Sequence, residues 1–109
     1  MKAYHITPRE TAARSILSRG FRDTAGTYMT EGLHKGVWLA DRPLYCVLPY
    51  DCTTAACLEV TVDGRAIRRY EWVEDGKGYR EWLVPAALLN ARAEVRHLTF
   101  EQTAALSWG

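Results

Sequence analysis

The sequence predicts a single α+β domain, with one early helix followed by a mainly antiparallel sheet. Two observations predict this class. A short strand-like segment leads directly into an amphipathic helix, and most of the remaining chain consists of short β-rich segments separated by turn signals. A chain of 109 residues, 48% hydrophobic and 25% charged, has the size and composition of one ordinary globular domain spanning residues 1–109.

The first predicted strand covers residues 2–6 and carries His5 to the start of a helix. Thr7 and Glu10 have the spacing of a capping box, and Pro8 suits the first helical position. Such a junction holds the histidine beside a helix N-terminus, where anions such as phosphate are favoured. A polar residue at the end of an edge strand is the plainer interpretation of His5.

The first helix is expected over residues 8–19, because its apolar residues fall on one face. Gly20 ends this helix as a left-handed cap, and Phe21 supplies the hydrophobic contact of that cap. Residues 22–35 follow no regular period and predict a long loop. That loop is either a solvated connection or a lid beside His5.

The later elements follow from alternation and from turn residues. Asp63-Gly64 predicts a hairpin between two of the strands, and Thr99 with Gln102 has the spacing of a second capping box. We expect a one-turn helix or turn at residues 86–89 and a short terminal helix at residues 100–106. The expected strands cover residues 36–40, 55–62, 66–73, 79–84 and 94–98.

Charge and cysteine usage limit the classes of partner and compartment. A net charge of +1 gives no overall field toward nucleic acid or membrane. Cys46, Cys52 and Cys57 match no zinc spacing, so we expect no metal site. An odd number of cysteines without a signal peptide favours reduced thiols and a cytoplasmic protein, with Cys57 in the core. No segment is long and apolar enough to cross a membrane.

The order of these segments resembles a known superfamily. Tyr-His-Ile-Thr at residues 4–7 precedes a helix of the form Ala-x-x-Ile-Leu-x-x-Gly, then Gly-Val-Trp-Leu-Ala-Asp at 36–41 and Arg-Glu-Trp-Leu-Val-Pro at 80–85. Together they resemble the ADP-ribosyltransferase-like fold of poly-ADP-ribose polymerases, diphtheria-type toxins, DNA-targeting ADP-ribosyltransferases and RNA 2′-phosphotransferases. The resemblance implies a split antiparallel sheet with an N-terminal helix and a short C-terminal helix. It also implies NAD as co-substrate.

The same resemblance implies roles for particular residues. His5 matches the first-strand histidine that bonds a ribose hydroxyl of NAD, and Thr7 would lie beside it. Glu81 matches the late-strand glutamate that bonds the ribose 2′-hydroxyl, so His5 and Glu81 are the expected catalytic residues. Trp38 occupies the motif that carries the nicotinamide-stacking aromatic, and Tyr45 or Tyr50, a few residues further on, competes with it for that role. An arginine near the first helix, with Arg19 preferred and Arg9 or Arg22 as alternatives, would neutralise the pyrophosphate.

These residue types fit the chemistry. Breaking the nicotinamide–ribose bond builds positive charge on the sugar, which a fixed carboxylate stabilises. The same carboxylate can orient or deprotonate an acceptor, while a stacking aromatic positions the leaving nicotinamide. Glu59 and Glu71 are also expected on strands. Each of these glutamates, Glu81 included, could instead pair with an arginine on a solvated face.

The expected activity is therefore a small mono-ADP-ribosyltransferase that modifies a protein or nucleic acid, as toxins and effectors do. An RNA 2′-phosphotransferase shares the fold, but Ile6 stands where that family has glycine after its histidine. A non-catalytic binding module on the same fold is a third possibility. The fourth is a nucleic-acid-binding domain in which basic and aromatic residues alternate, at Arg65, Arg68, Arg69, Tyr70 and Trp72.

Overall fold

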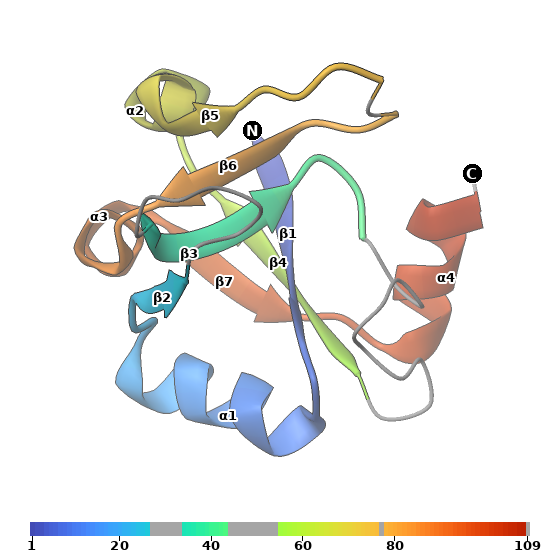
Figure 1. Ribbon diagram of the computed structural model, residues 1–109. Coiled ribbons are helices and arrows are strands. Elements are labelled where there is room, and N and C mark those ends of the chain that lie inside the picture. The colour runs from blue at the N-terminus through green and yellow to red at the C-terminus, as the bar shows by residue number, and fades with distance from the viewer. Residues whose placement is uncertain (27–33, 44–54, 77, 109) are drawn as a thin grey trace.

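The computed structural model describes residues 1–26, 34–43, 55–76 and 78–108 (Figure 1). The strands are β1 (Lys2–Thr7), β2 (Thr24–Gly26), β3 (His34–Ala40), β4 (Ala56–Thr61), β5 (Glu71–Trp72), β6 (Glu81–Val84) and β7 (Glu94–His97). The helices are α1 (Glu10–Arg19), α2 (Gly64–Ile67), α3 (Ala86–Arg92) and α4 (Phe100–Trp108), and a 3₁₀ turn, η1, covers Arg68–Tyr70. The predicted α+β class is confirmed.

The sheet has the strand order β5-β6-β3-β1-β4-β7, and β2 pairs with β3 beside this path. Every strand pairing in the described part of the chain is antiparallel. The predicted mainly antiparallel sheet is therefore confirmed. Five residues of the expected loop at 22–35 lie in strands instead: three form β2, and His34 and Lys35 begin β3. Residues 27–33 of that loop lie outside the described residues, as do Tyr45 and Tyr50.

Two well-paired halves of the sheet meet at a narrow junction. β1 and β4 share six registered residue pairs, and β3 and β6 share four. Between β1 and β3 the only registered pair is Tyr4 with Ala40. In Figure 1, β1 and β4 run along each other while β3 and β6 cross them steeply. The junction between the halves therefore lies where Tyr4 meets Ala40.

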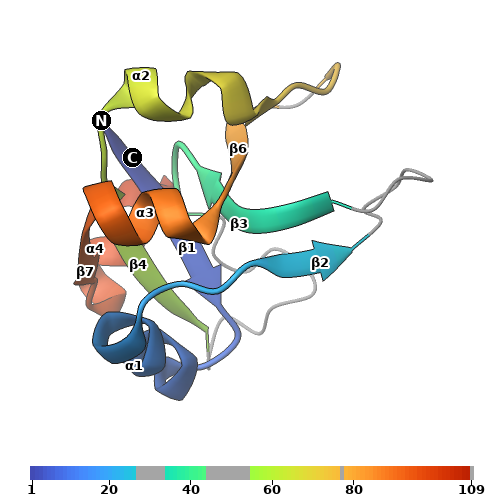
Figure 2. The ribbon, with the colours of Figure 1, turned by 90° about the vertical axis from the view of Figure 1, so that its left-hand side faces the viewer.

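The main core lies on the face of the sheet that α1, α2 and α3 cover (Figure 2). Alternate residues of the central strands point into it, including Val37, Leu39 and Leu58, each at most 2% exposed. A second, smaller cluster on the other face contains Tyr4, Ile6, Ala55, Cys57 and Leu98. The prediction that Cys57 belongs to the core is confirmed.

The expected capping box at the start of α1 is wrong. The helix begins at Glu10 rather than at residue 8, and its N-cap residue, Arg9, makes no side-chain capping bond. Thr7 is instead the last residue of β1, and its buried hydroxyl lies 2.9 Å from the Arg9 carbonyl and 3.4 Å from the Ala56 carbonyl. Glu10 pairs along the helix with Arg14 at 3.0 Å. Because the strand extends to Thr7, the Thr7 hydroxyl bonds to backbone carbonyls at the β1–α1 turn instead of capping the helix.

The predicted end of α1 is confirmed. Gly20 has φ of 88°, in the left-handed region that glycine adopts freely, and its N–H donates to the Ile16 carbonyl at 2.8 Å. A Cβ at this position would also lie 2.9 Å from the Asn90 side chain. Phe21 follows and is buried in the main core, as expected for the hydrophobic contact of such a cap.

The hairpin predicted at Asp63-Gly64 is wrong, and so is most of the strand predicted over residues 66–73. Asp63 accepts a hydrogen bond from the Arg65 N–H at 2.9 Å and thereby caps α2. Aspartate is favoured both in tight turns and at helix N-caps, so the local signal fits either structure. Ile67 is fully buried in the main core, and this burial favours the helical turn. The strand is limited to β5.

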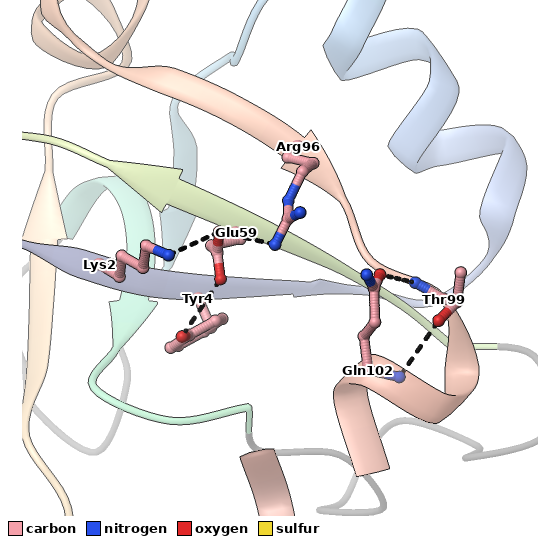
Figure 3. A network of polar contacts seen from close by, with 6 residues as sticks. All are labelled: Lys2, Tyr4, Glu59, Arg96, Thr99 and Gln102. Carbon is pink, nitrogen blue, oxygen red and sulfur yellow. Dashed lines mark hydrogen bonds and ion pairs between the residues drawn. The ribbon is translucent and has the colours of Figure 1, made fainter. Parts of the chain in front are cut away.

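The C-terminal predictions are largely confirmed. β7 occupies the expected position, and α3 extends to Arg92, beyond the single turn expected. α4 begins at Phe100 behind the predicted capping box, which Figure 3 shows. The Thr99 N–H donates to the Gln102 side-chain oxygen at 2.9 Å, and the Gln102 N–H donates to the Thr99 hydroxyl at 3.1 Å. Both donors would otherwise lack a partner at the helix start.

Candidate functional site

The three motifs singled out in the sequence lie on neighbouring strands. His5 is on β1, Trp38 on β3 and Glu81 on β6, and these strands are adjacent in the sheet. The positions are far apart in the chain, and the antiparallel pairing of β1 with β3 and of β3 with β6 places the three strands side by side. The candidate site is therefore centred on the junction between the two halves of the sheet.

His5 makes a hydrogen bond across this junction. Its Nδ1 lies 2.8 Å from the backbone carbonyl oxygen of Trp38. A carbonyl only accepts, so Nδ1 carries the proton and the neutral ring keeps a lone pair on Nε2. Burial lowers the pKa of His5, although the bond to Trp38 acts in the opposite direction. The ring is therefore a neutral acceptor at neutral pH.

Phe21 fixes the other side of the His5 ring. The two rings meet edge to face, with centroids 5.5 Å apart and planes at 86°. Asn90 of α3 holds the Phe21 backbone in both directions: its Oδ1 accepts from the Phe21 N–H at 2.7 Å, and its Nδ2 donates to the Phe21 carbonyl at 3.0 Å. Nearby, Asp23 accepts from the Ala86 N–H at 2.7 Å at the start of α3. Sequence reasoning missed Asn90, because its partner is distant in the chain.

Glu81 is only 7% exposed and belongs to a row of side chains that crosses the sheet. Residues directly opposite one another in antiparallel strands project from the same face. The registered pairs link one residue from each of six strands into a single row. From β5 to β7 the row is Trp72, Glu81, Ala40, Tyr4, Glu59 and Arg96.

Two tryptophans lie beside Glu81 on this face. Trp72 is its registered partner on β5, and Trp38, two residues before Ala40, shares the face of Ala40. The two indole rings meet edge to face at 5.5 Å and 77°. Sequence reasoning considered Trp72 only for nucleic-acid binding. Its position beside Glu81 depends on strand pairing, which no local motif signals.

At the other end of the row, Glu59 forms a polar network (Figure 3). Its buried carboxylate lies 3.2 Å from Arg96, 3.7 Å from Lys2 and 3.4 Å from the Tyr4 hydroxyl, which donates to it. Burial and the Glu59 charge raise the pKa of Tyr4. Glu59 is thus neutralised by cations from β1 and β7, and it ties these strands to β4.

Glu71, the other glutamate expected on a strand, is also paired. Arg80 binds it through two hydrogen bonds of 2.9 and 2.7 Å, and this pairing lowers the pKa of Glu71. Both Glu59 and Glu71 are therefore accounted for by arginine partners. Glu81 is distinguished from them by its place beside the two tryptophans.

The remaining expected site residues are placed differently. Thr7 is buried, with its hydroxyl directed to backbone carbonyls at the β1–α1 turn. Arg19 is exposed in the last turn of α1. Tyr45 lies outside the described residues.

His5 projects from the face of β1 opposite to Tyr4, toward Phe21, whereas Glu81 shares the face of Tyr4. Trp38 contacts residues on both faces: its carbonyl oxygen bonds to His5, and its ring packs against Trp72.

Comparisons with known proteins add no family. No protein-family model, curated protein or solved structure matches the chain. Among the described residues, no three His, Cys, Asp or Glu side chains are grouped so as to hold a metal ion. None of the helices in that same part of the chain has the length and apolar character needed to cross a membrane.

Proposed function

We propose that the protein is a mono-ADP-ribosyltransferase of the ADP-ribosyltransferase-like fold, which uses NAD to modify a protein or nucleic acid. The observation that carries the proposal is the adjacency of β1, β3 and β6, the strands that bear the histidine, aromatic and glutamate motifs. A sheet joined in two halves at Tyr4 and Ala40 fits the split sheet of that fold. Toxin or effector action is the biological role that we associate with this activity.

The contacts of His5 suit a ribose ligand. With the proton held on Nδ1 by the Trp38 carbonyl, Nε2 can accept a hydrogen bond from a sugar hydroxyl. The lowered pKa keeps the ring neutral at neutral pH, so this acceptor is available without a change of protonation. A ring fixed by Phe21 on one side would orient the hydroxyl with little loss of entropy on binding.

Glu81 and the tryptophans lie on the other face of the sheet from the His5 ring, so in this proposal the ribose reaches both across the junction of Tyr4 with Ala40. In the proposed reaction the C1′–nitrogen bond of NAD breaks, and its electron pair leaves with nicotinamide. The Glu81 carboxylate stabilises the positive sugar and then takes the proton that the acceptor's nucleophile loses as it bonds to C1′. Trp38 or Trp72 stacks on nicotinamide, because both rings lie on the face of Glu81.

Release of nicotinamide from NAD tests this proposal, with water as the acceptor when no other is added. We expect the wild-type protein to release nicotinamide and Glu81→Gln to be slower by about 100-fold, because the stabilising charge is lost. Glu71→Gln is the matched control: it makes the same change of charge on the adjacent strand, at the ion pair with Arg80. Equal rates for the two variants would contradict the role of Glu81.

The same measurements distinguish the two alternative functions on this fold, the RNA 2′-phosphotransferase and the non-catalytic binding module. Hydrolysis of NAD that depends on a 2′-phosphorylated RNA would favour the RNA 2′-phosphotransferase. NAD binding without any release of nicotinamide would favour a non-catalytic module.

A further inference from the structure

Three arginines gather on one side of the short helical segment between β4 and β5. α2 continues directly into η1, and Arg65, Arg68 and Arg69 fall at helical positions i, i+3 and i+4. Residues at this spacing are neighbours on a helix surface. All three residues are exposed. We call this set the arginine face; the strand expected here would have placed Arg68 and Arg69 on opposite sides.

The positive charge of the arginine face is not balanced by any acidic side chain among the described residues. In the described part of the chain, none of its three guanidinium groups forms an ion pair. The nearest acidic residues along the chain have other contacts. Asp63 caps α2, Glu71 is paired with Arg80, and the Glu74 carboxylate accepts a hydrogen bond from the Trp72 indole at 2.7 Å. The surface therefore suits an anionic partner with several regularly spaced charges.

One aromatic ring contacts the arginine face, and two further apolar side chains follow it along the chain. The Arg69 guanidinium lies 5.3 Å from the centroid of the Tyr70 ring, on which it stacks. Trp72 follows two residues later on β5, where it shares the face of Glu81 and is partly exposed, and Val73 is 79% exposed. An acidic peptide would use the charges but not the flat rings. Unpaired bases stack on such rings while arginines bind the phosphates between them.

We propose that the arginine face, with Tyr70 and Trp72, binds single-stranded nucleic acid. The guanidinium groups bind successive phosphodiesters, and the aromatic side chains stack on unpaired bases. Binding at this surface requires neither NAD nor Glu81. Because Trp72 also lies beside Glu81, replacement of the three arginines, rather than of Trp72, separates loss of nucleic-acid binding from loss of nicotinamide release.

Fluorescence anisotropy of labelled single-stranded oligonucleotides, about 20 nucleotides long, tests the proposal without NAD, with one DNA and one RNA probe. Neutralising three phosphates predicts a slope of about −2 when log affinity is plotted against log salt concentration. Replacing all three residues of the arginine face by alanine should weaken binding at least about tenfold and remove most of this slope.

A matched control removes the same charge elsewhere. Arg14, Arg42 and Arg92 are exposed on three other segments, and their combined replacement by alanine should leave the slope unchanged. Replacement of the arginine face by lysine should retain the slope, which separates lost charge from misfolding. Trp72→Leu should weaken binding at constant slope, because stacking carries no counterion release.

Three results would overturn the proposal. The first is the absence of salt-dependent binding to either probe by the wild-type protein. The second is an equal loss of affinity in the arginine-face and control variants. The third is competition by polyglutamate as effective, charge for charge, as competition by unlabelled oligonucleotide, since that would indicate a surface for acidic protein segments.

Discussion

The Nδ1 of His5 lies 2.8 Å from the carbonyl oxygen of Trp38, so a side chain bonds β1 to β3 where the two halves of the sheet meet. Among the described residues, the only registered backbone pair at this junction is Tyr4 with Ala40. The hydrogen bond fixes the tautomer of the ring, and Phe21 fixes its plane. The same contacts that stabilise the junction thus leave Nε2 as an oriented acceptor.

Stability should depend on pH through His5. Its folded pKa is lowered from the ordinary 6.5 by burial, so below about pH 6.5 the unfolded chain binds a proton that the folded protein resists. The free energy of unfolding should therefore fall as the pH drops, by at most about 1.4 kcal/mol per pH unit from this residue. Urea unfolding between about pH 8 and about pH 5 should show a weaker pH dependence in His5→Gln. Identical dependence in both proteins would contradict the lowered pKa.

Asn90 should stabilise the fold through the Phe21 backbone. Asn90→Ala leaves the Phe21 N–H and carbonyl without their partner and should lower the free energy of unfolding by about 1–3 kcal/mol. It should also shift the proton resonances of the His5 ring, because Phe21 packs against that ring. Arg92→Ala, at an exposed position on the same helix, is the control and should change neither quantity measurably.

The Cys57 thiol should be inert in the folded protein. Burial raises its pKa to about 12, so only about one molecule in 10⁴ carries a thiolate at about pH 8. Iodoacetamide should leave Cys57 unmodified in the native protein and alkylate it in urea, as measured by peptide mass spectrometry. Rapid labelling under native conditions would mean that the cluster of Cys57 with Tyr4, Ile6 and Leu98 opens readily.

The capping box should contribute to the stability of α4. Thr99→Ala removes the hydroxyl that accepts from the Gln102 N–H and should lower the free energy of unfolding by about 1 kcal/mol. Glu101→Gln, in the same turn, keeps both capping bonds and is the control. Urea titration measures the difference. A loss no greater than that of the control would show that α4 forms without help from its cap.

Short sequence motifs predicted which helices and strands form better than they predicted the residues at which these begin. Gly20 ended α1 as expected. A residue with positive φ commonly ends a helix, and glycine at that position is visible in the local sequence. The Thr7–Glu10 and Thr99–Gln102 spacings looked alike, yet only the second is a cap. The difference is that Thr7 continues the pairing of β1 with β4, and strand pairing is not visible in four residues. Asp63-Gly64 was ambiguous because aspartate is favoured both in tight turns and at helix N-caps.

The candidate site was predicted only in outline. Sequence motifs selected His5, Trp38 and Glu81, and the strands that carry them are neighbours. The face of the sheet from which each of these side chains projects could not be predicted, because it depends on the pairing of Tyr4 with Ala40. Asn90 and Trp72 likewise depend on contacts between distant segments.

NAD-induced thermal stabilisation tests the central claim most directly. A ligand that binds only the folded state raises the melting temperature, so about 1 mM NAD should stabilise the wild-type protein. His5→Gln should reduce that shift, because the oriented Nε2 acceptor is lost. Glu71→Gln, which alters an exposed ion pair, should retain it. If the wild-type melting temperature does not change with NAD, the protein does not bind the co-substrate and the transferase proposal is contradicted.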